Sequence, residues 1–143
     1  MTIIDLEPGD ERLISDLLPV LRELRPHLTE TLFHEVYREG HGQGLRFTAA
    51  YTDDGICAGA ARLARRRQYE HAAHAVRRRP GDHRRRTLHR HRQRLLAHLE
   101  RHARDAGCHH LTLDSGTHRT GAHRFYLRER MDIAAFHFAK ELR

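Results

Sequence analysis

The spacing of apolar residues predicts three elements at the start of the chain. Residues 2–6 read as a short strand, which Pro8 and the glycine after it would end. A helix is predicted from Asp10 onward, because leucines and a valine recur there at helical spacing. Pro19 falls inside this pattern and should kink or divide the helix. Thr29 can cap a second helix, so the chain is expected to begin with a strand and two helices.

A hairpin and further alternating elements are predicted after these helices. Residues 45–51 alternate as a strand does, and an Asp-Asp-Gly turn at 53–55 leads into a return strand at 56–61. The remaining predicted elements are a helix over 95–107, a strand over 111–113, a helix over 122–130 and a strand over 133–138. This order predicts an α/β fold, in which a mixed sheet is flanked by helices. The length of 143 residues suits a single domain, 1–143.

No element can be predicted between Arg62 and Arg94. The apolar residues there that are larger than alanine are Leu63, Tyr69, Val76 and Leu88. They follow neither a period of two nor one of 3.6, so no buried face can be drawn through them. We therefore expect the central strand of the sheet to be disrupted or irregular in this segment.

The same segment carries the basic charge of the chain. The formal net charge is +7, and the chain has 15 histidines. Residues 62–94 hold 13 arginines and five histidines against two acidic residues, a net of +11, whereas the other residues carry a net of −4. This split excludes a uniformly basic nucleic-acid-binding domain, because the chain is mildly acidic outside one block.

Bulk composition favours a cytoplasmic bacterial protein. No apolar run approaches the ~20 residues that cross a bilayer, and no signal peptide is visible at the N-terminus. Two cysteines, Cys57 and Cys108, do not make a disulfide framework, so a reducing compartment is expected. Lys140 is the only lysine beside 25 arginines, which indicates a GC-rich gene.

Three segments together resemble the GNAT superfamily of acetyl-CoA-dependent N-acetyltransferases. They are the helical run at 21–29, the hairpin at 47–59 and the C-terminal run at 95–138. Within the last of these, Ala122 to Tyr126 is similar to the signature helix of that family, an Ala-x-x-apolar-Tyr pattern before the final strand. The resemblance implies direct transfer of an acetyl group from acetyl-CoA to an amine of a small molecule or a protein.

The resemblance also implies which groups would carry the reaction. Acyl transfer needs positioned substrates, backbone donors for the oxyanion and a proton source for the departing thiolate. The signature tyrosine often supplies that proton, and Tyr126 has the matching position. An alternative is that Tyr126 only packs its helix onto the sheet beside Phe125. For the general base, Glu35 and Asp114 are candidates by residue type alone.

The cofactor-binding pattern of the family is incomplete in this chain. Many members have an asparagine where this chain has Arg119, and a glycine where it has Arg130. The family's glycine-rich loop, which cradles the pyrophosphate, would fall on residues 87–94, where no glycine occurs. Arginines can pair with phosphate, so the positional candidates for binding the cofactor are Arg90, Arg92, Arg94 and Arg119. Weak or absent binding of acetyl-CoA is expected.

We hypothesise that residues from about 60 to 94 are an out-of-frame translation of an ordinary acetyltransferase core. The flanks keep family-like spacing, while the block is rich in Arg, His, Ala and Pro, as a shifted frame of a GC-rich gene often is. A one-nucleotide shift also permits a strand-like string from His74 and a glycine-containing loop around 87–92. Stop codons in the shifted frame of the gene would disprove the idea.

Other interpretations of the basic block remain open. It could bind nucleic acid, since arginine clusters contact phosphates, although it has one aromatic residue, Tyr69, for stacking and no recognised binding motif. It could be a solvated, disordered insertion, because high charge with few apolar residues disfavours a core. A third alternative is a metal site, although the spacing of the candidate histidines fits no known ligand pattern. These candidates are His71, His74, His83, His89 and His91.

Overall fold

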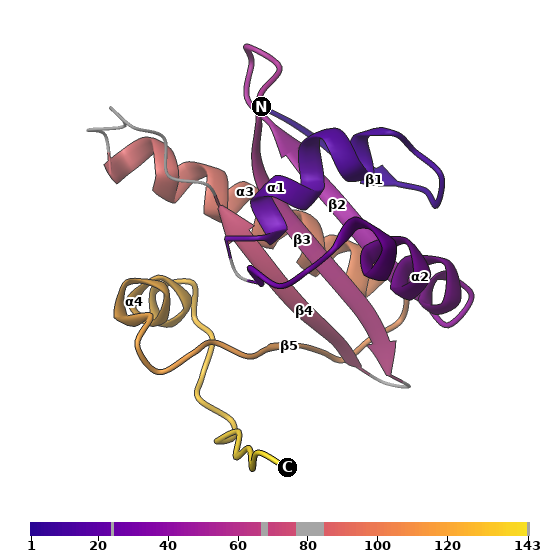
Figure 1. Cartoon of the computed structure of the whole chain (residues 1–143). Helices are drawn as coiled ribbons and strands as arrows, with labels where there is room; N and C mark the ends of the chain where they lie inside the picture. The colour runs from indigo at the N-terminus through magenta and orange to yellow at the C-terminus, as the bar shows by residue number, and fades with distance from the viewer. Residues whose placement is uncertain (24, 67–68, 77–84, 143) are drawn as a thin grey trace. The chain divides into compact units, whose positions relative to one another are not determined.

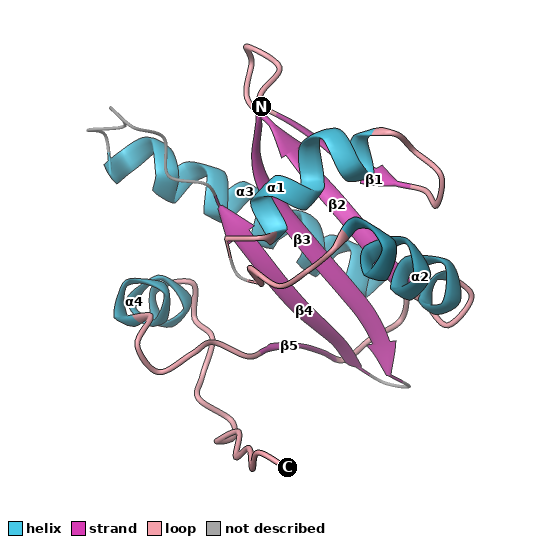
Figure 2. Ribbon diagram, viewed as in Figure 1, coloured by secondary structure: helices cyan, strands magenta, loops and turns pink. Residues whose placement is uncertain are grey.

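A five-stranded sheet with helices on both faces makes up most of the structure, which is a computed structural model (Figures 1 and 2). It describes residues 1–23, 25–66, 69–76 and 85–142. The described residues form two compact units, Met1–Leu113 and Asp114–Arg143. The single domain expected from the sequence stays a prediction.

The first unit contains the whole sheet. Its strands lie in the order β1-β2-β3-β4-β5, with the first four antiparallel in turn and β4 parallel to β5. The strands are β1 (Thr2–Leu6), β2 (Leu45–Tyr51), β3 (Cys57–Arg66), β4 (Tyr69–Val76) and β5 (His110–Leu113). The helices of this unit are η1 (Leu13–Leu17), α1 (Leu18–Leu21), α2 (Glu30–His41) and α3 (Arg85–Asp105). The mixed α/β fold that the sequence predicts is therefore confirmed.

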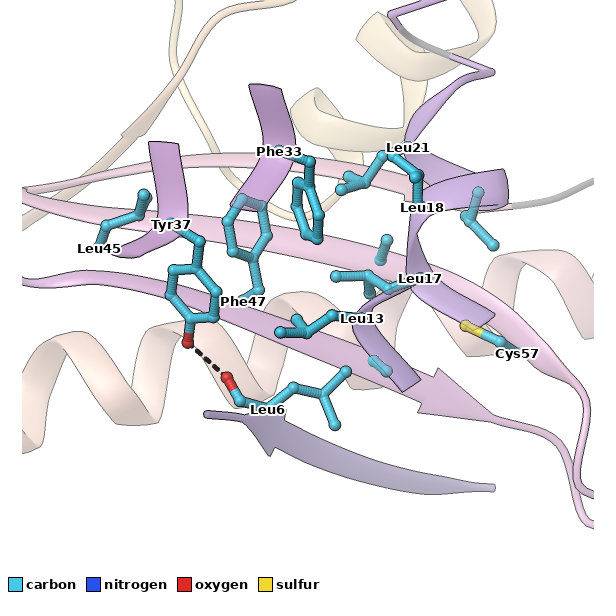
Figure 3. Close-up of a cluster of buried hydrophobic side chains, with 13 residues drawn as sticks. Leu6, Leu13, Leu17, Leu18, Leu21, Phe33, Tyr37, Leu45, Phe47 and Cys57 are labelled. Carbon is cyan, nitrogen blue, oxygen red and sulfur yellow. Dashed lines mark hydrogen bonds between the residues drawn. The ribbon is translucent and has the colours of Figure 1, made fainter. Parts of the chain in front are cut away.

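One face of the sheet is covered by η1, α1 and α2 (Figure 1). Alternate residues of β2 point to this side, where Phe33 of α2 meets the edge of the Phe47 ring at a centroid distance of 4.9 Å. The Tyr37 hydroxyl donates to the backbone carbonyl of Leu6, so the buried phenol has a partner (Figure 3). This is the larger of the two apolar clusters found among the described residues.

The other face is covered by α3, through a smaller cluster. Leu95 and Leu99 of α3 are fully buried against small residues of the sheet, among them Ala50 and Ala61. Alanines at these positions let the helix approach the sheet closely. Leu63 of β3 is also buried in this cluster, with 1% of its surface exposed.

The elements predicted before residue 61 are confirmed, and local signals explain their limits. The predicted division of the helix at Pro19 is not observed, because the backbone stays helical from η1 into α1 through Leu17 and Leu18. The Thr29 hydroxyl accepts a hydrogen bond from the Leu32 N–H at 3.2 Å and caps α2. The hairpin between β2 and β3 turns at Gly55, whose φ of 77° suits a glycine.

Residues 62–94 contain elements that the sequence did not predict. β3 continues to Arg66, β4 pairs with β3 along its whole length, and α3 begins at Arg85 instead of Leu95. The backbone of 69–76 is a continuous strand, while 67–68 and 77–84 lie outside the described residues, so the expected disruption or irregularity of this region stays a prediction there. Strands depend on their neighbours more than on local preference, and arginine and glutamine are good helix formers.

The final strand predicted from the sequence is also wrong. Residues 133–138 have no strand partner in the structure, and Phe136 and Phe138 are 80% and 91% exposed. The described part of the second unit contains one helix, α4 (Thr120–Arg128), and no strand. A sequence of strand-forming residues becomes a strand only where its backbone groups find a neighbouring strand.

A polar contact joins β1, β2 and α3 through side chains of these three elements. The Asp5 carboxylate accepts a hydrogen bond from the Thr48 hydroxyl and lies 3.2 Å from His98 Nε2 of α3. The hydrogen bond with His98 is the main reason that the pKa of Asp5 lies below its usual value, against the opposing effect of burial.

We expect Asp5→Asn to lower the free energy of unfolding by about 1 kcal/mol at pH 7. Because the folded state lowers the pKa of Asp5, its contribution is present above the unfolded pKa and is lost as the pH falls through the folded pKa. The difference in the free energy of unfolding between the parent chain and Asp5→Asn should therefore be smaller at about pH 3 than at pH 7. Urea unfolding at both pH values measures this difference, with Asp132→Asn as an exposed control. An equal loss at both values would contradict this explanation.

Candidate active site

The parallel strands β4 and β5 pair along only half of β4. Their register runs from Tyr69 opposite His110 to Ala72 opposite Leu113, while β4 continues to Val76. In the described structure, the last four residues of β4 thus have a neighbour on one side, β3, and an open edge on the other. Backbone groups on such an edge can hydrogen-bond an extended ligand that carries amides.

A helix begins shortly after this open edge. The chain passes from the end of β4 at Val76 to the start of α3 at Arg85, through residues 77–84, which lie outside the described residues. The N-terminus of a long helix after a strand favours a bound phosphate, through its free N–H groups and its dipole. The glycine-rich loop expected at 87–94 has no counterpart there, because those residues are inside α3.

The three arginines predicted to bind the cofactor on α3 do not form one cluster. Arg90 and Arg94 are exposed and one turn apart, whereas Arg92 is partly buried and lies two residues from each. Arg94 donates from Nη2 to the backbone carbonyl of Met1 at 2.9 Å, which ties α3 to the start of β1. These arginines lie on the helix itself and not in a loop before it.

The other two predicted site residues share the second unit. Arg119 precedes α4 as its N-terminal cap position, is exposed, and makes no side-chain capping bond. Tyr126 lies seven residues later, which is two helical turns along a similar face. The Tyr126 ring is partly buried, with its centroid 5.5 Å from that of Phe125.

The described residues exclude some other kinds of site among themselves. No three His, Cys, Asp or Glu side chains of that part of the chain come together as metal ligands, and the five histidines considered for a metal site include side chains outside it. No helix in that part is long and apolar enough to span a bilayer. Both cysteines are free thiols.

A comparison with protein families matches residues 11–131 to the model of the acetyltransferase (GNAT) family. The chain belongs to the GNAT family. No curated protein sequence is significantly similar to it.

Several solved structures of acetyltransferases share the GNAT fold with this chain. An aminoglycoside acetyltransferase, AAC(6')-Iy in complex with a bisubstrate analog, is 14% identical with a TM-score of 0.74, and the match covers 100% of this chain and 99% of that one. AAC(6')-Ih from Acinetobacter baumannii is 17% identical (TM-score 0.70, 99% of each chain). Glucosamine-6-phosphate N-acetyltransferase from Arabidopsis thaliana is 16% identical (TM-score 0.66, 99% and 98%).

One departure from the GNAT signature has a visible structural consequence. Arg130 stands where the resemblance places a glycine, and its φ is 63°, the only positive value of a non-glycine residue among the described residues. Helices commonly end in this left-handed conformation at a glycine, because any side chain there is strained. The backbone of this GNAT chain therefore keeps the left-handed turn after α4, although the residue there is an arginine and not a glycine.

We expect Arg130→Gly to raise the midpoint of thermal unfolding by relieving this strain, with a gain of about 0.5–1 kcal/mol. Arg128→Gly is the matched control, because Arg128 is exposed and ends α4 with a helical backbone, so that change should destabilise by a similar amount. The two variants should shift the midpoint in opposite directions in calorimetry. A loss of stability in Arg130→Gly would show that the Arg130 side chain matters more than the strain.

A second group of polar residues in the GNAT fold has no signal in the sequence. The Tyr51 hydroxyl donates to Asp16 Oδ2 at 2.8 Å, and the Ser15 hydroxyl donates to the other Asp16 oxygen. Burial raises the pKa of Tyr51 well above its usual value, and the Asp16 carboxylate adds to the effect. No sequence signal marks this contact, since it joins residues 35 positions apart.

Proposed function

We propose that this chain transfers the acetyl group of acetyl-CoA to the primary amine of a small molecule. The match to the GNAT family over residues 11–131 is the observation that carries the proposal. The open edge of β4 and the start of α3 at Arg85 support it, because they would suit an extended, phosphate-bearing cosubstrate. Structural neighbours include enzymes that acetylate aminoglycosides and a sugar amine, which favours an amino sugar as acceptor.

The proposed reaction breaks the thioester C–S bond of acetyl-CoA and forms an amide C–N bond. The nitrogen lone pair attacks the carbonyl carbon, the amine loses a proton to a base, and the coenzyme A thiolate gains a proton from Tyr126. Asp114 is the better candidate for the base, since it directly follows β5, and ligands of parallel sheets bind at the carboxyl ends of strands. Glu35 is exposed on α2, the helix that packs on β2 through Phe33 and Tyr37.

Mass spectrometry tests the proposed function directly. The chain is incubated with acetyl-CoA and, separately, with neamine, glucosamine 6-phosphate and a lysine peptide. We expect enzyme-dependent release of coenzyme A and a product heavier by one acetyl group with at least one amino sugar. Acetylation of the peptide alone would favour a protein acceptor, and thioester hydrolysis without an acetylated product would contradict amine transfer.

We expect acetyl-CoA itself to bind weakly, with a dissociation constant well above the micromolar range. The segment over 87–94 is helical and has no glycine, so its backbone N–H groups do not form a loop around the pyrophosphate. The side chain of Arg94 does not substitute for such a loop, because it already donates to a backbone carbonyl. Isothermal titration calorimetry of the full chain measures the affinity. Micromolar binding would contradict the expectation.

Nucleic-acid binding is the alternative function, and the described arginines give it little support. Arg90 and Arg94 share one side of α3, whereas Arg92 lies on the other, so the three do not line up as one stripe along a phosphate backbone. A salt titration with nonspecific DNA separates the two functions, because phosphate contacts weaken steeply as salt rises. We place the enzyme in the cytoplasm, which suits a chain with two free thiols.

A further inference from the structure

One histidine of α4 holds the loop that precedes this helix. His123 Nε2 lies 3.0 Å from the backbone carbonyl oxygen of Gly116, seven residues back along the chain. A carbonyl oxygen only accepts hydrogen bonds, so Nε2 carries the proton and donates it. Side chains of a helix point toward its N-terminus, and His123 lies near the start of α4, so its ring reaches back over the loop. Both partners belong to the unit Asp114–Arg143.

The Gly116 carbonyl fixes the conformation of this loop. It also accepts a hydrogen bond from the Arg119 N–H at 2.9 Å, which closes a turn over residues 116–119. Each lone pair of the oxygen therefore has a donor. A Cβ atom at position 116 would lie 2.7 Å from His118 Cε1, so a side chain there would displace the imidazole ring. The glycine allows this ring to lie against the backbone of the loop.

This contact links the two groups that the proposed reaction needs. Asp114, the candidate base, lies two residues before Gly116. Tyr126, the candidate proton donor, lies three residues after His123 on the same helix. The Asp114 side chain is 61% exposed, so a substrate amine can reach its carboxylate. The hydrogen bond to the Gly116 carbonyl thus limits how far the base can move relative to the proton donor.

We propose that His123 is a positioning residue for acetyl transfer, which holds the loop of Asp114 against the helix of Tyr126. This role rests on the proposed function. His123 acts through the loop, because its Nε2 proton is engaged by the Gly116 carbonyl. Acyl transfer is sensitive to such alignment, since a displacement of about 1 Å can lower a rate about 100-fold.

Two substitutions separate the hydrogen bond from the bulk of the side chain. His123→Leu removes the donor and keeps an apolar side chain, whereas His123→Gln keeps an N–H donor at a similar distance from the backbone. Leucine and glutamine are both good helix formers, so both variants keep α4. His109→Leu is the matched control, because His109 is an exposed histidine outside this loop.

Steady-state kinetics with the best amine of the acceptor panel measures the effect. We expect His123→Leu to lower kcat about tenfold or more, with KM for acetyl-CoA changed less than about threefold. His123→Gln should retain kcat within about threefold of the parent value, and His109→Leu should equal the parent chain. A role in folding alone would leave kcat of the folded protein unchanged in all three variants.

Hydrogen exchange of the Arg119 amide tests the contact without any need for activity. The Arg119 N–H donates to the same carbonyl, so a loosened loop exposes it to solvent more often. In His123→Leu we expect NMR to show about fivefold faster exchange of this amide, as the loss of one hydrogen bond predicts. His123→Gln should exchange at the parent rate.

The two measurements fail in different ways. An unchanged kcat in His123→Leu, or equal losses of kcat in the leucine and glutamine variants, overturns the positioning role. An unchanged exchange rate of the Arg119 amide in His123→Leu overturns the contact on which the role depends. If the parent chain acetylates no amine, the proposed function fails and the catalytic role of His123 fails with it, whereas the exchange rates still decide whether His123 holds the loop.

Discussion

Tyr126→Phe is expected to lower kcat for acetyl transfer by about 100-fold while leaving KM for acetyl-CoA nearly unchanged. The substitution removes one oxygen and keeps the ring, whose centroid lies 5.5 Å from that of Phe125, so the packing of α4 is retained. If Tyr126 protonates the departing thiolate, the loss falls on the chemical step and not on binding. Steady-state kinetics with the best amine from the acceptor panel measures both constants.

Tyr51→Phe is the matched control for this result. It deletes the same atom from a tyrosine whose hydroxyl donates to Asp16 at 2.8 Å, far along the chain from the signature helix. Its expected cost is about 1 kcal/mol of stability with kcat unchanged. If Tyr126→Phe loses less than about threefold in kcat, the hydroxyl is not the proton donor, and Tyr126 has the packing role beside Phe125.

Local signals predicted the first half of the fold well. Thr29 marks the start of α2 because a hydroxyl can bond an N–H three residues ahead, and no distant residue is needed. Gly55 marks the hairpin turn for an equally local reason, since its positive φ suits a glycine. Elements whose boundaries depend on neighbours in sequence are the ones that one sequence can reveal.

The errors fall where structure depends on distant partners. β4 contains alanines and histidines with no strand pattern, yet its backbone pairs with β3 in continuous register. Residues 133–138 have a strand pattern but no partner strand. The contact between Asp5 and His98 joins positions 93 residues apart, and no motif announces it. In each case the deciding interaction lies outside the window from which a pattern can be read.

The hypothesis that residues from about 60 to 94 are an out-of-frame translation stays a prediction. Leu63, which lies in this segment, packs in one cluster with Leu95 and Leu99, which lie outside it. The nucleotide sequence of the gene over this segment decides the matter.

Phe33→Ala is expected to cost about 3–5 kcal/mol of folding free energy. Phe33 is 1% exposed and meets Phe47 edge-on at 4.9 Å and Tyr37 at 6.5 Å, so its removal leaves a cavity between α2 and β2. Domains of this size are stable by only about 5–15 kcal/mol. Thermal unfolding should shift downward by roughly 10 °C or more.

Leu32→Ala on the same helix separates burial from helix preference. Leu32 is the neighbour of Phe33 along α2 but is 41% exposed, so its truncation should cost well under about 1 kcal/mol. Both variants gain an alanine, which favours helix, and both keep the Thr29 cap. Equal losses in the two variants would mean that α2 does not pack on β2 as described. A large loss for Phe33→Ala alone would show that the aromatic cluster holds α2 against the sheet.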